Sequence, residues 1–168
     1  MVEAVPLHAA TLRYFSPAGP FAAAVAAATG MPVPTPLTAT LSQHLVLAWL
    51  RPTETLALSE EGAPIAELRE RLAQAAGGYV VDLTGGLKAF RVRGARGPEL
   101  LCRLGSAALA LRVGEARSGR FADVPVLVVC VRVEETLLVV DRAYAEHLRG
   151  WIEATVAPNG RDAVPKLE

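Results

Sequence analysis

The stretch VVDLTGGLKAFRVRGARGPELLCRL, residues 80–104, contains the clearest fold signals in this chain. Its first glycine pair, Gly85-Gly86, separates two strand-like runs, YVVDL at 79–83 and LKAFRVR at 87–93. Because glycine adopts positive φ without strain, we interpret this pair as part of a hairpin turn. The second glycine cluster, GARGP, precedes a helical pattern with Pro98 in its first turn. The segment therefore predicts strand, turn, strand and helix.

Glycine and arginine together also occur in loops that bind phosphate groups. Such a loop needs glycines immediately before a helix, so that free backbone N–H groups point at the anion. Gly85-Gly86 precedes a strand pattern instead, and the sequence contains neither GxxxxGK[ST] nor a GxGxxG that follows a strand. GARGP does precede a helix and could meet an anion there. A Gly-Pro start without further signals is more often only the beginning of a helix.

Strand and helix patterns alternate along the chain in two similar series. The first series has strands at 7–15, 45–50, 54–59 and 79–83 and helices at 20–29 and about 63–76, with the proline-rich 31–40 as a loop or extended connection. The second has strands at 87–93, 124–131 and 136–140 and helices that begin near Gly97 and, capped by Asp141, at 142–156.

The order β-α-β-β-α-β followed by β-α-β-β-α predicts an α+β fold. It would consist of two tandem split β-α-β halves, ferredoxin-like in type, that share a mixed or antiparallel sheet. We place a single domain at residues 1–157, with lobes at roughly 1–83 and 84–157, and expect a flexible tail at 158–168.

The apolar content is high for a soluble chain, with 52% hydrophobic residues and a mean hydropathy of +0.32. Runs such as VPVLVVCV at 124–131 and LVLAWL at 45–50 are apolar on both faces. Strands of this kind need cover on both sides. Helices cover one side, so the second cover is either the sheet of the other half or another chain.

We expect a cytoplasmic protein. The start, MVEAVPLH, carries an acidic residue and no basic region of the kind that opens a secretory signal. The alanine-rich run at 21–30 is shorter than the roughly 20 apolar residues that a membrane span needs. Cys102 and Cys130 are too few for a disulfide framework and lie in apolar stretches, so we expect reduced packing residues.

The net charge is zero, but residues 88–120 hold eight basic residues against two acidic ones, a local excess of six. This stretch is a solvated face, a patch that meets an acidic partner protein, or a contact for nucleic acid or a folate tail. Exposed aromatic residues are not interleaved with the arginines, so the stacking part of a nucleic-acid site is missing. The interface candidates in this stretch are Arg91, Arg93 and Arg96.

The sequence offers little for catalysis. His8, His44 and His147 show no metal-ligand spacing, and there is no GxSxG, no HExxH and no cysteine with a local basic partner. Glu60-Glu61 and Glu134-Glu135 are adjacent carboxylates at strand ends, which are normally solvated turn residues. We therefore expect no catalytic residue and no metal site in this chain.

The stretch 80–104 resembles the strand and Leu-Leu helix of the aminomethyltransferase (glycine cleavage T-protein) superfamily. It is more similar still to the gamma subunit of heterotetrameric sarcosine oxidase. The family's chain order is matched over about residues 7–156 by PFAAAVAAATGMPVPTPLTAT, LVLAWLRPTETLALSEEG, the strand pair RSGRFADVPVLV, and LLVVDRAYAEHLRGWIEAT. Residues 51–55 depart from the family's Gly-Pro-Asp-Glu-Trp, and 103–106 from its usual Lys-Gly-Cys-like turn. That turn also marks folate-dependent iron–sulfur maturation relatives, so its absence argues against that branch.

The resemblance implies the fold of the T-protein N-terminal region and a non-catalytic subunit of a complex that oxidatively demethylates sarcosine or a related N-methyl amine. The partners would be larger flavin-containing subunits. FAD, FMN, NAD and tetrahydrofolate would belong to them, and this chain would bind no cofactor.

Two alternatives stay open. The first is a stand-alone tetrahydrofolate-binding protein, for which Asp82 is the candidate carboxylate at a strand end. The second is a nucleic-acid-binding module that uses the arginine-rich stretch 88–120.

Overall fold

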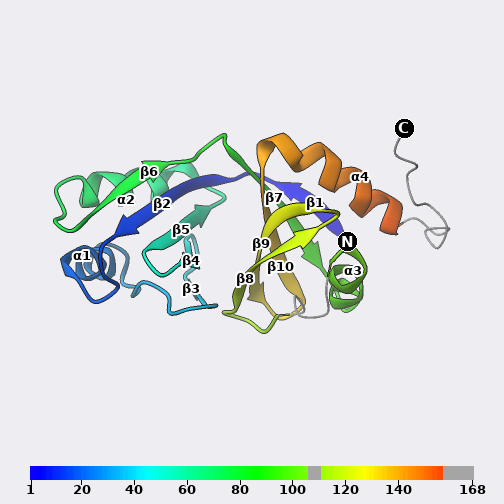
Figure 1. Ribbon diagram of the computed structural model, residues 1–168, viewed down its shortest axis with the longest axis horizontal. Helices are drawn as coiled ribbons and strands as arrows, with labels where there is room; N and C mark the ends of the chain where they lie inside the picture. Colours follow the sequence, from blue (N-terminus) through cyan, green and yellow to red (C-terminus); the bar gives the residue numbers. More distant parts are fainter. Residues whose placement is uncertain (106–110, 157–168) are drawn as a thin grey trace.

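The computed structural model describes residues 1–105 and 111–156. These residues form two five-stranded sheets in which every pair of neighbouring strands is antiparallel, so the predicted α+β class is confirmed. Figure 1 shows the two halves side by side along the long axis, α1 and α2 with one sheet and α3 and α4 with the other. In chain order the elements are β1 (Val2–Val5), β2 (His8–Tyr14), α1 (Pro20–Thr29), β3 (Ala39–Leu41), β4 (Val46–Arg51), β5 (Glu54–Ser59), α2 (Gly62–Leu72), β6 (Gly78–Asp82), β7 (Leu87–Arg93), α3 (Gly97–Leu104), β8 (Ala116–Phe121), β9 (Val124–Arg132), β10 (Glu135–Asp141), a 3₁₀ turn (Arg142–Tyr144) and α4 (Ala145–Val156).

The two sheets follow the same plan. Their strand orders are β3-β4-β5-β2-β6 and β8-β9-β10-β7-β1. In the first sheet, β4-β5-β2-β6 is the order expected of a split β-α-β half. In the second, β9, β10 and β7 take the corresponding positions. After α4 the described chain provides no strand equivalent to β6, and β1 takes that place by pairing antiparallel with β7.

The two halves each have a sheet of their own, and the sheets meet at one edge. An isolated antiparallel bridge joins Thr38 to Glu115. Beside it, the Ala39 amide donates to the Gly114 carbonyl at 2.8 Å and the Ala116 amide to the Leu37 carbonyl at 3.0 Å. The predicted shared sheet is thus divided in two, with β3 and β8 forming the seam.

Each sheet is covered on both faces. Phe21, Val25 and Leu68 of α1 and α2 pack on one face of the first sheet, and α3 and α4 pack on the second sheet through residues such as Leu101 and Leu148. The inner faces pack on each other through small and branched side chains from both sheets: Ala9, Ala39, Ala48, Leu56, Leu58, Ala89, Ala116, Leu127, Val129 and Val139. For these strands the second cover is therefore the sheet of the other half, the first of the two alternatives.

The interpretation of residues 84–86 as a hairpin turn is wrong. The turn itself exists, because Gly85 has φ +85° and the Gly86 amide donates to the Leu83 carbonyl at 2.9 Å. However, β6 pairs with β2, whereas β7 pairs with β1 and β10. The glycines carry the chain from one sheet to the other. Turn chemistry is a local property, whereas the pairing of these strands is decided by partners far away in the sequence.

Other differences concern short or irregular elements. β1 was not predicted, β3 lies partly within the proline-rich connection, and α2 ends at Leu72, earlier than expected. The last helix begins with a 3₁₀ turn whose cap is the predicted Asp141, which accepts from the Ala143 amide at 2.8 Å. The tail predicted at 158–168 lies outside the described residues. Across the described ranges, no helix is long and apolar enough to cross a bilayer.

Candidate functional site

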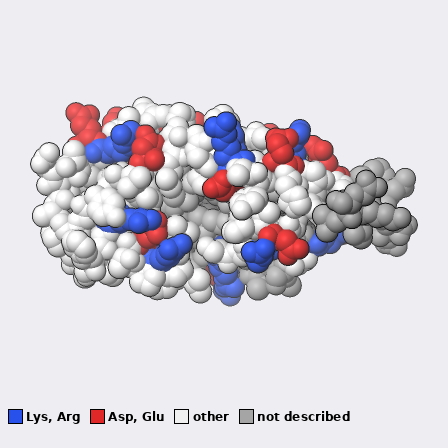
Figure 2. All heavy atoms as spheres, turned by 45° about the horizontal axis from the view of Figure 1, so that its top comes forward, with Lys and Arg blue, Asp and Glu red and all other residues white. Residues whose placement is uncertain are grey.

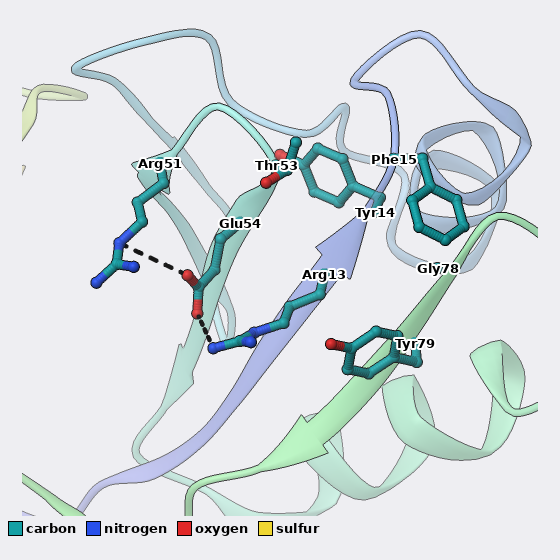
Figure 3. Close-up of a pocket in the computed structure, with 8 residues that line it drawn as sticks. All are labelled: Arg13, Tyr14, Phe15, Arg51, Thr53, Glu54, Gly78 and Tyr79. Atoms are coloured by element: carbon teal, nitrogen blue, oxygen red, sulfur yellow. Dashed lines mark hydrogen bonds and ion pairs between the residues drawn. The ribbon is translucent and has the colours of Figure 1, made fainter.

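A hollow of about 280 Å³ lies where β2, β5 and β6 meet at the outer end of the first sheet. We call it the Arg13 pocket; Figure 3 shows its lining residues, which are Arg13, Tyr14, Phe15, Arg51, Thr53, Glu54, Gly78 and Tyr79. Side chains alternate between the two faces of a strand, so Arg13 lies on the same face of β2 as Ala9, which belongs to the core between the sheets. The pocket is thus the exposed continuation of that inner face.

A buried carboxylate organises the Arg13 pocket. Glu54, at the start of β5, accepts a hydrogen bond from the Thr11 hydroxyl at 2.8 Å. It also forms ion pairs with Arg13 at 3.3 Å and with Arg51 at 3.8 Å. Two guanidinium groups against one carboxylate leave one positive charge in excess. The Tyr79 hydroxyl and then the Glu54 carboxylate raise the pKa of Arg13 further, so this cation is permanent.

Aromatic side chains border the same hollow. Phe15 and Tyr79 are 85% and 52% exposed, which is unusual for residues of this size. Tyr14 points to the other face, where its hydroxyl lies 2.9 Å from that of Thr55 and its ring stacks on Phe21. The pocket therefore combines exposed rings with surplus positive charge.

The chemistry of this pocket favours binding over catalysis. Glu54 is the only carboxylate among its lining residues, and it is engaged by two arginines and a hydroxyl. No histidine or cysteine lines the pocket. Sequence reasoning missed these residues. A signal was present, because Arg13 interrupts an apolar strand, and Arg51 and Glu54 bracket the turn between β4 and β5.

Two of the three predicted interface arginines lie in a partly exposed cluster of ion pairs. Arg91 is only 8% exposed; it contacts Glu60 and lies 3.1 Å from Glu135 and 3.5 Å from Glu3. Arg93 pairs with Glu3 at 3.1 Å and with Glu135 at 3.3 Å. We call these five residues the Arg91 cluster. It ties β1, β7 and β10 to the residue that follows β5, and so joins the two halves.

The third predicted arginine lies outside this cluster. Arg96 has an 85% exposed side chain and pairs with Glu99 at 3.1 Å. The positive excess of residues 88–120 is thus partly compensated by carboxylates from distant segments, which pair with Arg91 and Arg93. Figure 2 shows the result on one face of the molecule, where basic and acidic side chains lie next to one another. The prediction of a solvated turn residue is wrong for Glu135, whose side chain is 13% exposed in β10, whereas Glu60 is exposed after β5 and also pairs with Arg91.

Asp82, the folate candidate, caps the turn after β6. One carboxylate oxygen accepts from the Thr84 amide at 2.8 Å, and the other pairs with Arg69 of α2 at 2.6 Å. The hydrogen bonds from Thr84, followed by the charge of Arg69, hold the pKa of Asp82 below its ordinary value. The carboxylate is therefore ionised at neutral pH and occupied by its own chain.

The described residues contain no group of three side chains that could hold a metal ion. His44 pairs with Glu61 at 3.3 Å, and the His147 ring lies 3.0 Å from the Ala122 carbonyl. Both cysteines are free; Cys130 is buried as predicted, and burial raises the pKa of its thiol. The expectation that Cys102 is a packing residue is wrong, because it lies on the exposed face of α3.

Comparisons with known proteins agree with this fold. Residues 15–158 match the sequence profile of a family described as "Sarcosine oxidase, gamma subunit family". A chain of heterotetrameric sarcosine oxidase from Corynebacterium sp. U-96, solved with pyrrole 2-carboxylate, is similar with a TM-score of 0.83 and 24% identity, over 98% of this chain and 87% of that one. The glycine cleavage aminomethyltransferase T of Bartonella henselae gives 0.68 and 14%, over 90% of this chain but only 45% of its own. No curated protein matches the sequence. At these identities, the two structures show the fold alone.

Proposed function

The chain belongs to the sarcosine oxidase gamma subunit family, and from this premise we propose that it is a non-catalytic subunit of a sarcosine-oxidase-type flavoenzyme complex. The observation that carries the proposal is the family match over residues 15–158. The complex would oxidatively demethylate sarcosine or a related N-methyl amine. Its proposed site of action is the cytoplasm.

The proposal assigns all cofactors to the partners. FAD, FMN, NAD and tetrahydrofolate would be held by larger flavin-containing subunits, and this chain would bind none of them. A non-catalytic role is supported by two carboxylates, Glu54 of the Arg13 pocket and Asp82. Both are engaged by arginines of the chain itself. A side chain in such an ion pair is poorly suited to take up and release a proton during a reaction.

For the interface, we propose roles that differ among the predicted arginines. Arg96 and Arg93, with side chains 85% and 41% exposed, are available to contact an acidic surface of a larger subunit. Arg91, whose side chain is 9% exposed, would act indirectly by holding β7 in place. No observation favours the folate-binding or the nucleic-acid-binding alternative.

The test is purification of the tagged chain from its native host, with identification of the co-purifying subunits. We expect a complex of fixed stoichiometry that shows a flavin absorption spectrum and oxidises sarcosine or another N-methyl amine. The isolated chain should be colourless and inactive, and it should give no heat when titrated with tetrahydrofolate. Recovery of the chain without any partner, or an isolated chain that oxidises sarcosine, would overturn the proposal.

A further inference from the structure

The outer edge of β6 has unpaired backbone groups. β6 is the last strand of its sheet and pairs only with β2. The Phe15 amide donates to the Gly77 carbonyl at 3.1 Å, and the Leu83 amide donates to the Ala9 carbonyl at 2.8 Å. Hydrogen-bonding direction alternates along an antiparallel strand, so Tyr79 and Val81, which lie between Gly77 and Leu83, also bond to β2. Gly78, Val80 and Asp82 therefore direct their N–H and C=O groups away from the sheet.

This edge shows few of the features by which proteins usually protect an edge strand. Short length, prolines, bulges and charged side chains are the common devices. The other three edges show them: β1 is four residues long and contains Glu3, β3 is three residues long and follows a proline-rich segment, and β8 carries Arg117 and Arg120. β6 reads GYVVD, with Tyr79 52% and Val81 39% exposed and a single charge at its last residue. The edge is therefore suited to pairing with a further strand.

Two hollows lie on opposite faces of this edge. The Arg13 pocket is on the inner face, and a hollow of about 490 Å³ lies between β6 and α2. The second hollow is lined by Ala66, Arg69, Glu70, Leu72, Ala73, Gly78, Tyr79 and Val80. Successive side chains of an added strand would point alternately to the two faces. One set would reach the Arg13 pocket and the other would lie over α2.

The charges of the two hollows differ, and this difference defines the occupant. Arg13 and Arg51 against Glu54 leave a positive excess on the inner face, beside the exposed ring of Tyr79. On the α2 face, Arg69 pairs with Asp82 at 2.6 Å, and Glu70 lies beside alanine and leucine side chains. The matching strand carries an acidic side chain toward Arg13 and apolar side chains toward α2.

We propose that an extended segment of a larger subunit adds to the first sheet as a sixth strand beside β6, with an acidic side chain directed at Arg13. The identity of the partner rests on the proposed function. A second copy of this chain would fit less well, because its β6 would bring Tyr79 and Val81, and no carboxylate, to the inner face.

Amide hydrogen exchange tests the pairing directly. In the isolated chain, the outward amides of Val80 and Asp82 should exchange rapidly, whereas those of Tyr79 and Val81 should already be protected by β2. In the purified complex, the outward amides should slow by roughly tenfold or more, because they gain a hydrogen-bond partner. A complex that forms with unchanged exchange over Gly78–Asp82 overturns this inference and leaves the proposed function standing. Failure to obtain any complex counts against the function itself.

Variants at the edge provide an independent test. Val80→Pro removes an outward N–H without taking a hydrogen bond from β2, and Val81→Lys adds a charge where the side chain is 39% exposed. The matched control is Val133→Lys, at an 82% exposed valine between β9 and β10. Both edge variants should weaken association with the larger subunit roughly tenfold or more, and the control should not. Should Val80→Pro fail to fold, Val81→Lys remains as the test.

Two outcomes contradict the proposal. One is normal assembly of a folded edge variant. The other is an isolated chain that is dimeric and becomes monomeric in Val81→Lys, because the edge would then pair with a second copy. Sedimentation of the wild type and of Val81→Lys distinguishes that case from a chain that stays monomeric until it binds the larger subunit.

Discussion

Arg91→Ala tests how the two halves are held together. The Arg91 side chain is 9% exposed and contacts carboxylates from three segments: Glu3 of β1, Glu60 after β5 and Glu135 of β10. Removal of the guanidinium leaves Glu135, which is 13% exposed, with Arg93 as its remaining partner in the Arg91 cluster. It also removes the ion pair that joins Glu60 of the first half to β7 of the second.

The expected loss of stability follows from these burials. Removing one partner of a buried ion pair costs about 3–5 kcal/mol, because the other charge stays buried and unpaired. Glu3 and Glu60 are 39% and 49% exposed, so water can solvate them once Arg91 is gone. We therefore expect a loss of about 2–3 kcal/mol for Arg91→Ala. For a chain of this size, this loss of stability corresponds to a fall in Tm of roughly 4–12 °C.

Arg93→Ala is the matched control. Arg93 lies on the same strand and contacts Glu3 and Glu135, but its side chain is 41% exposed. A pair of this kind contributes less than about 1 kcal/mol. Thermal and urea unfolding of both variants, followed by circular dichroism, gives the comparison. High salt should diminish the small effect at Arg93 more than the larger one at Arg91, because buried pairs are screened less.

The reasoning is refuted if Arg91→Ala costs no more than Arg93→Ala. A second informative result is an Arg91→Ala chain of normal stability that no longer assembles with the larger subunits. It would assign Arg91 to the contact surface, as the sequence first indicated.

Three further predictions concern single positions. A Cβ at Gly78 would lie 2.4 Å from a ring carbon, so Gly78→Ala should cost about 2 kcal/mol in urea unfolding, whereas Gly150→Ala, in open space on α4, should stabilise by roughly 0.5–1 kcal/mol. A thiol reagent should modify exposed Cys102 rapidly in the native chain and buried Cys130 only after unfolding. Because its folded-state pKa is lowered, Asp82 should stabilise the fold above the unfolded-chain value of about 4, and this contribution should disappear as pH falls through the lower folded value. In Asp82→Asn, stability should fall less steeply with acid, after a loss of about 0.5 kcal/mol at neutral pH.

The sequence predicted elements best where the pattern is long and regular. The strand at 87–93, the helix at 20–29 and the cap at Asp141 match the structure closely. Short strands were missed for physical reasons. VEAV at 2–5 contains one alternation at most, and ARSGRF at 116–121 mixes charged and small residues without alternating polar and apolar ones. The strand at 116–121 was indicated only by the family resemblance.

The candidate site was harder to predict, because its charges pair across long stretches of chain. A count over residues 88–120 records a positive excess, yet the partners of Arg91 lie at Glu3, Glu60 and Glu135, all outside that window. The apolar strands illustrate the same limit. Their excess of apolar surface indicated a second cover but could not distinguish a partner chain from the other half, which provides it. The family match, rather than apolar content, therefore carries the proposal of a larger partner.

The two halves differ most at the strand position filled by β6 in one and by β1 in the other. The second half has no sixth element of its own in the described chain, and β1 from the far end of the sequence closes the edge of β7. The chain thus already adds a strand to an open edge of this fold. Nothing in the described chain does the same for β6, whose outer groups stay unpaired beside exposed Tyr79 and Val81. An edge of this kind favours association with another chain. In a protein that belongs to a family of enzyme subunits, it is the first place to look for the partner.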